Sequence, residues 1–512
     1  MRRILILALG IMAMASACDK KVSDRTADLP PLQPANQDLN AGNWRLILLS
    51  RPDSFAVAAP VATTSPLYVA DLNEIKGYQK NLSGDMQGRI KYWSAGGVMR
   101  WNEIMRDLMA KYNLPPYQNA DGTYPAPNAA NPFAYPQFPF SNPPYAARAY
   151  AYISAAQYDA LVACWHYKNQ YKRPAPYQVD TTVKALAGRS TLPSYPSEGA
   201  VLAGATAEMM QLFFPGEVAN IQQKLEQQEL ALIASGAATR SDISAGETLG
   251  RQIAEVFIAR GRADNAGKAG GTATDWNNFV TVTQTKGETP WYSLEAPKRP
   301  PQLPLFGRVK GFLCDSAAIV ALRPGPPPST SSDQMKQETL DAYNTIKNPS
   351  REQMRIVQFW ADGVGTYTPP GHWNAIAAED FVTKNYSEVR WARNMALLNM
   401  AEMDAAISCW DIKYYYFNPR PTQLDSRIKT LTGIPNFPSY VSGHSMFSFA
   451  AATVLGHIIP ERAGAYTAMA QEAANSRVYA GIHYAIDCDA GRTVGQNLGN
   501  IAINRAKADG AE

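Results

Sequence analysis

The sequence repeats itself at one fixed spacing. Residues 159–180, DALVACWHYKNQYKRPAPYQVD, align without gaps with residues 404–425, DAAISCWDIKYYYFNPRPTQLD, and ten of the 22 positions are identical. Unrelated sequences would share roughly one or two. The same offset of 245 residues aligns residues 245–264 with residues 490–509. One offset over more than a hundred residues indicates two homologous units, so the chain must build one fold twice.

The two units span roughly residues 85–265 and 345–512. Both contain apolar stretches with the helical period, such as residues 394–410 and 447–459, whereas alternating strand patterns are scarce. We therefore expect an all-α protein made of two homologous helical bundles. Residues 266–344 lie between them and contain many Gly, Pro and Thr residues, which predicts an irregular connector rather than a third domain.

The N-terminus has the pattern of a targeting segment. Two arginines precede a short apolar stretch, and small residues then lead to Cys18. Residues 1–18 resemble a bacterial lipoprotein signal peptide, which would make Cys18 the lipidated first mature residue; the alternative is an ordinary secretory cleavage near Ala17. Residues 19–84 would form an N-terminal extension. We expect an exported protein of a bacterial cell envelope, anchored to a membrane and facing the periplasm or the cell surface.

Composition excludes several classes of partner. The formal net charge is only +4, and no basic run or stripe appears, so we expect no nucleic-acid partner. No later segment is apolar for long enough to cross a bilayer, so a lipid anchor would be the only membrane attachment. Four further cysteines could form disulfides or remain buried thiols: Cys164, Cys314, Cys409 and Cys488. The oligomeric state is not specified by the sequence.

Comparison of the two units points to a site in the second. Both units carry a lysine and an aspartate at matching positions, but the second unit alone adds two arginines and two histidines. A purely structural role would more often appear in both units, so we interpret the additions as functional. The matched positions, second unit first, are Lys413 and Lys168, Arg420 and Ala175, His444 and Gly199, Arg477 and Leu232, His483 and Ala238, and Asp487 and Asp242.

These residue types suit an oxyanion. Lys413 and Arg420 are seven residues apart, which corresponds to two helical turns, so both could point at one anion. Arginine offers a planar fork of donors and lysine a point charge. Ser442 and Gly443 precede an apolar helix, whose free N–H groups attract anions, and Gly443 would let the backbone approach closely.

The remaining residues supply acid–base and nucleophilic groups. Arg477 adds a third cation. His483 and Asp487 are four residues apart, so Asp487 could hold the far nitrogen of the imidazole and raise its basicity. Asp487 recurs where the first unit has no histidine, which leaves a packing or capping role open as well. We predict that one of the two histidines, His444 and His483, attacks or ligates the central atom of the oxyanion. The other would act as acid and base.

The motifs Lys413-x6-Arg420-Pro421, Ser442-Gly443-His444 and Ser476-Arg477-x5-His483-x3-Asp487 resemble the signature of a known superfamily. It contains the type 2 phosphatidic acid phosphatases (PAP2, acid phosphatases) and the vanadium haloperoxidases. Val441 departs from it, because the family usually has proline there. The resemblance implies that Lys413, Arg420, Ser442, Gly443 and Arg477 bind the oxyanion. It further implies that His483 is the ligand of vanadium or the phosphate nucleophile, and that His444 is the acid–base residue.

The chain looks closest to the bacterial haloperoxidase-related branch. Members of that branch have two bundles with the site in one, and Trp410 and Phe437 match aromatic positions on the halide side of vanadium chloroperoxidases. Trp410 has a counterpart in the first unit, Trp165, so it could equally be a packing residue. Among the other histidines, we expect His457 to be structural and leave open whether His372 lines the cleft.

The resemblance implies a vanadate-dependent haloperoxidase that oxidises halide with hydrogen peroxide, with vanadate as cofactor. The alternative is a non-specific acid phosphatase that hydrolyses phosphomonoesters through a phosphohistidine and needs no cofactor. Vanadate and phosphate occupy the same geometry, so the residues that bind the oxyanion cannot separate these readings. A non-enzymatic protein of the cell surface ranks last, because it leaves the complete set of catalytic residue types unexplained.

Overall fold

The computed structural model describes residues 29–114, 142–294 and 298–512, and these are helical without a β-strand. The all-α prediction is confirmed. The predicted signal peptide and Cys18 lie outside the described residues.

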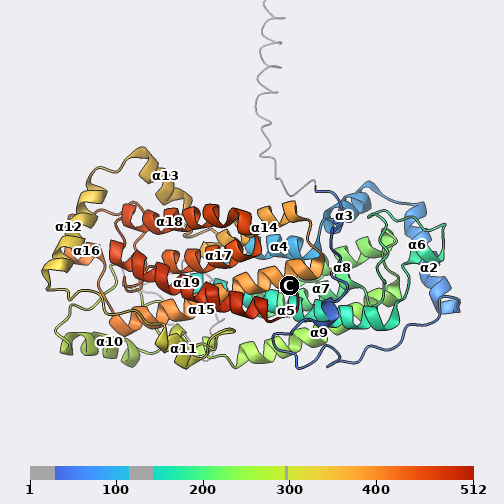
Figure 1. Ribbon diagram of the computed structural model, residues 1–512, viewed down its shortest axis with the longest axis horizontal. Coiled ribbons are helices and arrows are strands. Elements are labelled where there is room, and N and C mark those ends of the chain that lie inside the picture. Colours follow the sequence, from blue (N-terminus) through green and yellow to red (C-terminus); the bar gives the residue numbers. More distant parts are fainter. Residues whose placement is uncertain (1–28, 115–141, 295–297) are drawn as a thin grey trace, which may run out of the picture.

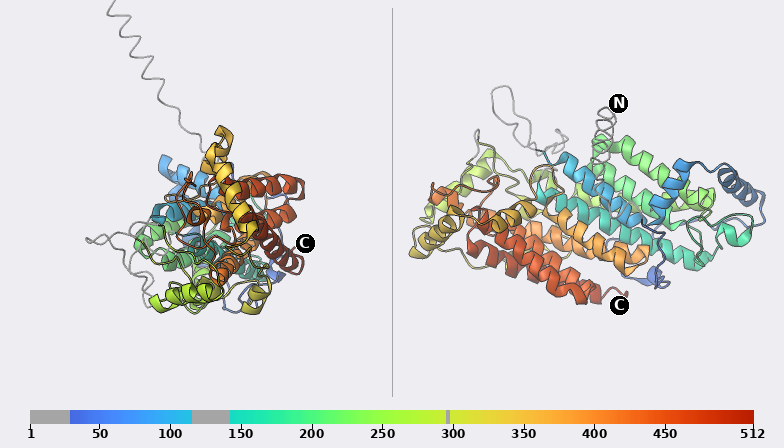
Figure 2. Two further views of the ribbon diagram at one scale, coloured as in Figure 1. Left: turned by 90° about the vertical axis from the view of Figure 1, so that its left-hand side faces the viewer. Right: turned by 90° about the horizontal axis from the view of Figure 1, so that it is seen from above.

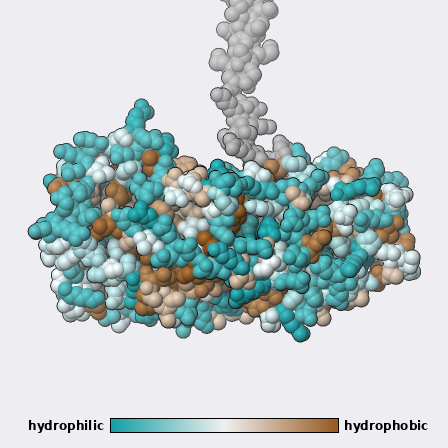
Figure 3. All heavy atoms as spheres, in the orientation of Figure 1, coloured by the Kyte–Doolittle hydropathy of each residue, from teal (hydrophilic) through white to brown (hydrophobic). Residues whose placement is uncertain are grey.

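No helix within the described ranges is long and apolar enough to cross a membrane. Figure 3 shows a mostly hydrophilic face with scattered apolar areas. The four cysteines named above are buried free thiols.

Helix boundaries recur at the offset of the sequence repeat. The two longest helices, α5 (Pro143–Tyr171) and α15 (Glu388–Tyr416), both have 29 residues. Each bundle continues with four helices at matching positions. They are α6 (Pro176–Val179) and α16 (Pro421–Leu424), α7 (Glu198–Phe213) and α17 (Gly443–Ile458), α8 (Val218–Ala234) and α18 (Ala463–Tyr479), and α9 (Arg240–Arg262) and α19 (Ala485–Lys507). This recurrence is what two homologous units would produce; their origin by duplication stays a prediction.

Further helices precede each bundle and lie between them. The first bundle is preceded by α2 (Pro66–Lys80), α3 (Gly84–Ser94) and α4 (Gly97–Tyr112), and the second by α13 (Arg351–Phe359) and α14 (Thr368–Lys384). Short 3-10 turns are η1 (Ala41–Asn43), η2 (Pro215–Glu217), η3 (Ala266–Lys268), η4 (Phe306–Arg308) and η5 (Pro460–Arg462).

The segment 266–344 is less irregular than the sequence predicts. It contains α10 (Ala273–Thr285) and α11 (Ser316–Ala321), and α12 (Asp333–Lys347) runs across its expected end. The side chain of Thr272 caps α10, and that of Ser332 caps α12. Such single caps stabilise these helices between proline-rich loops. The abundance of Gly and Pro around them is why the sequence predicts irregular structure for the whole segment.

The two bundles meet along their longest helices. In Figure 1, α2, α3 and α8 lie at one end of an elongated body and α12, α16 and α18 toward the other, while Figure 2 shows the same elongation from above. Helix α5 packs extensively against α15 between them. Both helices are buried on nearly every face, so apolar and small residues occur all round them, and the buried polar residues among them, such as Arg148 and Arg393, have polar partners.

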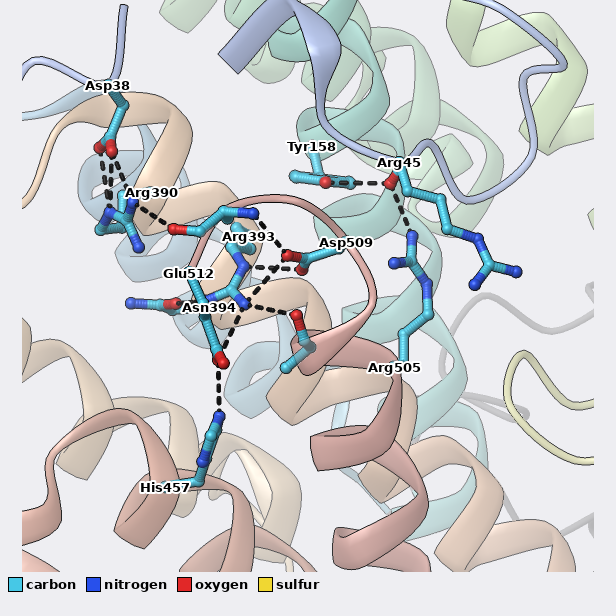
Figure 4. A network of polar contacts seen from close by, with 12 residues as sticks. Asp38, Arg45, Tyr158, Arg390, Arg393, Asn394, His457, Arg505, Asp509 and Glu512 are labelled. Atoms are coloured by element: carbon cyan, nitrogen blue, oxygen red, sulfur yellow. Dashed lines mark hydrogen bonds and ion pairs between the residues drawn. The ribbon is translucent and has the colours of Figure 1, made fainter. Parts of the chain in front are cut away.

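A network of ion pairs attaches the C-terminus to this centre (Figure 4). Arg393 Nε lies 2.7 Å from Asp509 Oδ2, and His457 Nε2 lies 2.8 Å from Glu512 Oε1. The first bundle repeats the first pair, because Arg148 Nε lies 2.7 Å from Asp264 Oδ2. The contact of His457 agrees with its expected structural role.

Glycines set how closely the last helix of each bundle approaches its neighbour. A Cβ atom on Gly250 would lie 2.1 Å from the carbonyl oxygen of Val201, and one on Gly495 would lie 2.4 Å from that of Met446. Both helix pairs therefore pack backbone against backbone. In the second bundle this contact holds the beginning of α19, which carries Asp487, beside the beginning of α17.

Substitution of Gly495 by alanine should destabilise the protein by about 1–3 kcal/mol, because the new methyl group has no space. Gly77→Ala in α2 is the matched control. No heavy atom lies within 4 Å of that Cβ position, and alanine favours helix by about 1 kcal/mol, so stability should rise slightly. Urea unfolding followed by circular dichroism measures both. Equal stability of Gly495→Ala and the wild type would contradict this packing.

Candidate active site

Four segments of the second bundle bring the predicted residues into one buried cluster. Lys413 lies near the end of α15, and Arg420 is the N-cap of α16. Arg477 is in the last turn of α18, and His483 lies in the turn before α19. The exposed fraction is 0% for Lys413 and Arg420, 2% for Arg477 and 3% for His483. Buried charge on this scale requires compensating partners.

The ammonium group of Lys413 binds backbone. Its Nζ donates to the carbonyl oxygens of Pro438 and Ser439 at 2.8 Å each and of Val441 at 2.5 Å. Three acceptors use all three protons of an ammonium group. Lys413 therefore fastens the turn that leads into α17 and contributes its charge to the site from behind that turn. Burial, with Arg420 as a further cause, lowers the pKa of Lys413 to about 8.

Arg420 stands beside the catalytic histidine predicted from the sequence. Its Nη1 donates to the carbonyl oxygen of Ile482 at 2.6 Å and lies 3.5 Å from His483 Nε2. Its Nε donates to the carbonyl oxygen of Phe437 at 2.9 Å. Burial lowers the pKa of Arg420 to about 9, so the guanidinium is still charged at neutral pH. A group bound to His483 Nε2 would meet this positive charge directly.

Arg477 supplies the third cation. Its Nη2 donates to the carbonyl oxygen of Trp360 at 2.7 Å, and its Nε to Ser476 Oγ at 2.8 Å. Burial lowers the pKa of Arg477 to about 10, and Asp362 opposes that shift. Backbone carbonyls thus hold all three cations, and Asp487 and Asp362 are the carboxylates that oppose the lowering of their pKa values. An anion in the cluster would relieve the lowered pKa values of the cations.

Asp487 orients His483. The carboxylate Oδ2 lies 2.8 Å from His483 Nδ1 and accepts a hydrogen bond from Ser439 Oγ at 2.6 Å. Because a carboxylate accepts, Nδ1 carries the proton and Nε2 keeps its lone pair. Burial and then Arg420 hold the pKa of His483 well below its usual value, while burial raises that of Asp487 to about 6. At neutral pH the pair is a neutral imidazole on a carboxylate, which suits a nucleophile or ligand.

His444 faces a second carboxylate that the sequence analysis missed. His444 Nε2 lies 3.7 Å from Asp362 Oδ2, and both atoms are buried without a hydrogen bond. Asp362 Oδ1 lies 3.0 Å from His372 Nδ1, and the ring of His372 stacks on Trp360. Burial and then Arg477 hold the pKa of His444 well below its usual value. The segment 360–376 aligns only with an insertion, so the repeat comparison could not single out Asp362.

The beginning of α17 is open for an anion. Ser442 is its N-cap, and the Ser442 N–H already donates to the carbonyl oxygen of Asp487 at 2.9 Å. The Ser445 N–H donates to Ser442 Oγ at 3.4 Å, and the N–H groups of Gly443 and His444 have no acceptor within the helix. A Cβ on Gly443 would make only ordinary contacts, the nearest to Cys409 Sγ at 3.7 Å. Protein packing therefore does not require glycine at position 443. A bound group that approaches the backbone closely would explain why glycine stands there.

Two aromatic residues border the cations. The rings of Trp410 and Phe437 are 5.0 Å apart, and the Phe437 ring centre lies 5.0 Å from Lys413 Nζ and 5.1 Å from Arg420 Cζ. Trp410 is 1% exposed and donates its indole N–H to the carbonyl oxygen of Gln302. Trp410 thus ties the connector to α15, while Phe437 covers the positive charges. Their placement on a halide side stays a prediction.

The low pKa of His444 makes stability depend on pH. Below about pH 6.5 the unfolded chain protonates this histidine and the folded protein does not, so the free energy of unfolding falls as pH decreases. We expect His444→Gln to lose less stability than the wild type between pH 6.5 and 5, as measured by urea unfolding. Identical pH slopes would show that His444 is not held neutral.

Comparison with known proteins finds a family that matches most of the second bundle. The model of the PAP2 superfamily matches residues 394–508, which include the predicted site residues from Lys413 to Asp487. A non-specific acid phosphatase of Salmonella typhi is 35% identical over 103 residues. That match covers 19% of this chain and 41% of the phosphatase, so the chain spans about two fifths of the length of this curated relative.

Solved structures resemble a larger part of the chain. A bacterial vanadium-dependent iodoperoxidase has a TM-score of 0.56 and 22% identity over 71% of this chain and 91% of its own. A bacterial vanadium-dependent chloroperoxidase in its holo form has a TM-score of 0.50 and 14% identity over 74% of this chain and 96% of its own. At these identities the likeness is one of fold, and it extends beyond the second bundle.

Proposed function

Because the second bundle belongs to the PAP2 superfamily, we propose that this protein is an enzyme whose oxyanion is vanadate and whose reaction is the oxidation of halide by hydrogen peroxide. Its partners would be these small molecules. Export and lipidation at Cys18 belong to the same proposal, and place the reaction in the cell envelope.

One observation carries the proposal: His483 has one ring nitrogen occupied by Asp487 and the other facing Arg420 within a buried group of cations. The buried Nε2 of His444, which has no hydrogen-bond partner among the described residues, supports the fit of these residues to a bound oxyanion. Vanadate, when bound through its vanadium to His483 Nε2, would supply the Lewis-acid centre that activates hydrogen peroxide.

The protein's own residues have separate tasks in this reaction. Lys413, Arg420 and Arg477 balance negative charge in a site that water does not screen. Asp487 keeps the proton of His483 on Nδ1, so that Nε2 stays available. His444, neutral at pH 7, can take a proton from the incoming hydrogen peroxide and return it.

The second candidate is acid phosphatase chemistry, which the relative from Salmonella typhi favours. His483 Nε2 would attack phosphorus, and the ester bond would break as a protonated His444 gives its extra proton to the leaving oxygen. The bound phosphate would favour this protonated form, because its negative charge raises the pKa of His444. Water would then hydrolyse the phosphohistidine. The similarity to haloperoxidase structures over more than two thirds of the chain supports the first candidate.

A pair of assays on the purified protein separates the candidates. With added orthovanadate and hydrogen peroxide we expect oxidation of iodide, bromide or chloride. Without orthovanadate we expect little release of p-nitrophenol from p-nitrophenyl phosphate. Hydrolysis that vanadate inhibits, without halide oxidation, would replace the first candidate by the second.

Substitutions test the site under either chemistry. His483→Ala should remove activity to the background level, because it removes the proposed ligand or nucleophile. His444→Gln should lower kcat by roughly 10²–10⁴-fold, the usual contribution of an acid–base group. His457→Ala is the matched control, since His457 pairs with Glu512, and its activity should be unchanged. Full activity of His483→Ala would refute the site.

A further inference from the structure

The first bundle contains a cavity of about 360 Å³ at the place that corresponds to the site of the second bundle. The offset of 245 residues relates the walls of the two places. Among the residues that line the cavity, Trp165, Lys168, Ala175, Ser197, Gly199 and Ala238 align with Trp410, Lys413, Arg420, Ser442, His444 and His483. This cavity, which we name the first-bundle cavity, is therefore the structural counterpart of the candidate active site.

The first-bundle cavity has lost the groups that would hold an oxyanion. Ala175, Leu232 and Ala238 replace two arginines and a histidine, so two positive charges are gone and the wall is aliphatic. Protein interiors normally pack without voids of this size. The first bundle thus has a cavity where the second bundle has large polar side chains. Such a cavity has the form of a binding pocket, with a lining that differs chemically from the oxyanion site.

The charges that remain available in the first-bundle cavity are negative. Glu198 stands at the position of Gly443, and its Oε1 accepts a hydrogen bond from Trp165 Nε1 at 3.0 Å. Glu388 also lines the cavity and accepts hydrogen bonds from the backbone N–H groups of Gly97 and Val98. Within the described ranges, neither carboxylate takes part in an ion pair.

The two cations along this cavity are engaged or exposed. Lys168 is buried; its ammonium group donates to the carbonyl oxygen of Pro193 and lies 5.6 Å from the centre of the Trp165 ring. Arg189 is solvent-exposed. Neither lies close enough to Glu198 or Glu388 to form an ion pair among the residues described, so a positively charged guest would find both carboxyl groups without a cation. Burial raises the pKa of Glu388 to about 7, and a cation beside it would lower that pKa again.

Other residues that line the cavity indicate which kind of group the rest of the ligand carries. Trp93, Trp165 and Tyr177 present aromatic surface, which attracts both apolar groups and cations. Gln228 is 2% exposed and lines the same cavity. Its Oε1 accepts from Trp101 Nε1 at 2.7 Å, while its Nε2 donates to no acceptor among the described residues. The amide can therefore donate to an oxygen of the guest.

We propose that the first-bundle cavity binds a small organic ammonium compound with an apolar or aromatic body. The ammonium group pairs with Glu198 and Glu388, and the body lies against the aromatic rings and the aliphatic wall. This site is separate from the oxyanion site and does not depend on which reaction occurs there.

Three probes that differ in charge test the proposal by isothermal titration calorimetry on the full mature chain. They are 2-phenylethylamine, which is a cation, 2-phenylethanol, which is neutral, and phenylacetate, which is an anion. We expect 2-phenylethylamine to bind at least about tenfold more tightly than 2-phenylethanol, because of its ion pair. Phenylacetate should not bind. No binding of 2-phenylethylamine, or equal binding of phenylacetate, would overturn the proposal.

Variants locate the binding. Glu198→Gln should weaken binding of 2-phenylethylamine at least about tenfold, whereas Glu226→Gln on the exposed face of α8 is the control and should not. His483→Ala should bind as the wild type does, since the oxyanion site is not involved. Unchanged affinity of Glu198→Gln would refute the assignment. A crystal structure with 2-phenylethylamine gives an independent check if that variant does not fold, because the ligand must then lie beside Glu198.

Discussion

The second bundle depends on the way that backbone carbonyls hold three buried cations. The ammonium group of Lys413 binds the turn at residues 438–441, Arg420 binds the carbonyl oxygens of Phe437 and Ile482, and Arg477 binds that of Trp360. These bonds connect the ends of separate helices and compensate for the loss of water around each charge. Neutral carbonyls do this without cancelling the charge, so the site remains positive and receptive to an anion.

The same arrangement explains the protonation of the two histidines. Cations and burial together keep His444 and His483 neutral at neutral pH, although each has a carboxylate nearby. A neutral imidazole has one lone pair to offer, and the carboxylate decides which nitrogen offers it. For His483 the arrangement is complete, because Asp487 takes Nδ1. For His444 it involves Asp362, which comes from the loop before α14.

The two bundles show which parts of the sequence build the scaffold and which supply chemistry. Matching helices, the arginine–aspartate pairs of Arg148 and Arg393, and the glycine contacts of α9 and α19 occur in both. Between these shared elements, the first bundle has aliphatic residues and Glu198 where the second has cations and Gly443. One scaffold thus surrounds a buried cluster of cations in one bundle and a cavity with two carboxyl groups in the other, and a few residue differences account for this contrast.

The sequence by itself determined the all-α class, the repeated organisation and the identity of the residues that meet in the buried cluster of the second bundle. Each of these follows from local periodicity, from the 245-residue offset or from the spacing of the motifs. Only the tertiary structure showed that Lys413 donates its hydrogen bonds to backbone carbonyls and that Asp362 lies beside His444. It also showed that helices form within 266–344 and that the first bundle contains a cavity. These features arise between segments distant in the chain, and side-chain direction and packing there follow from the whole fold rather than from neighbouring residues.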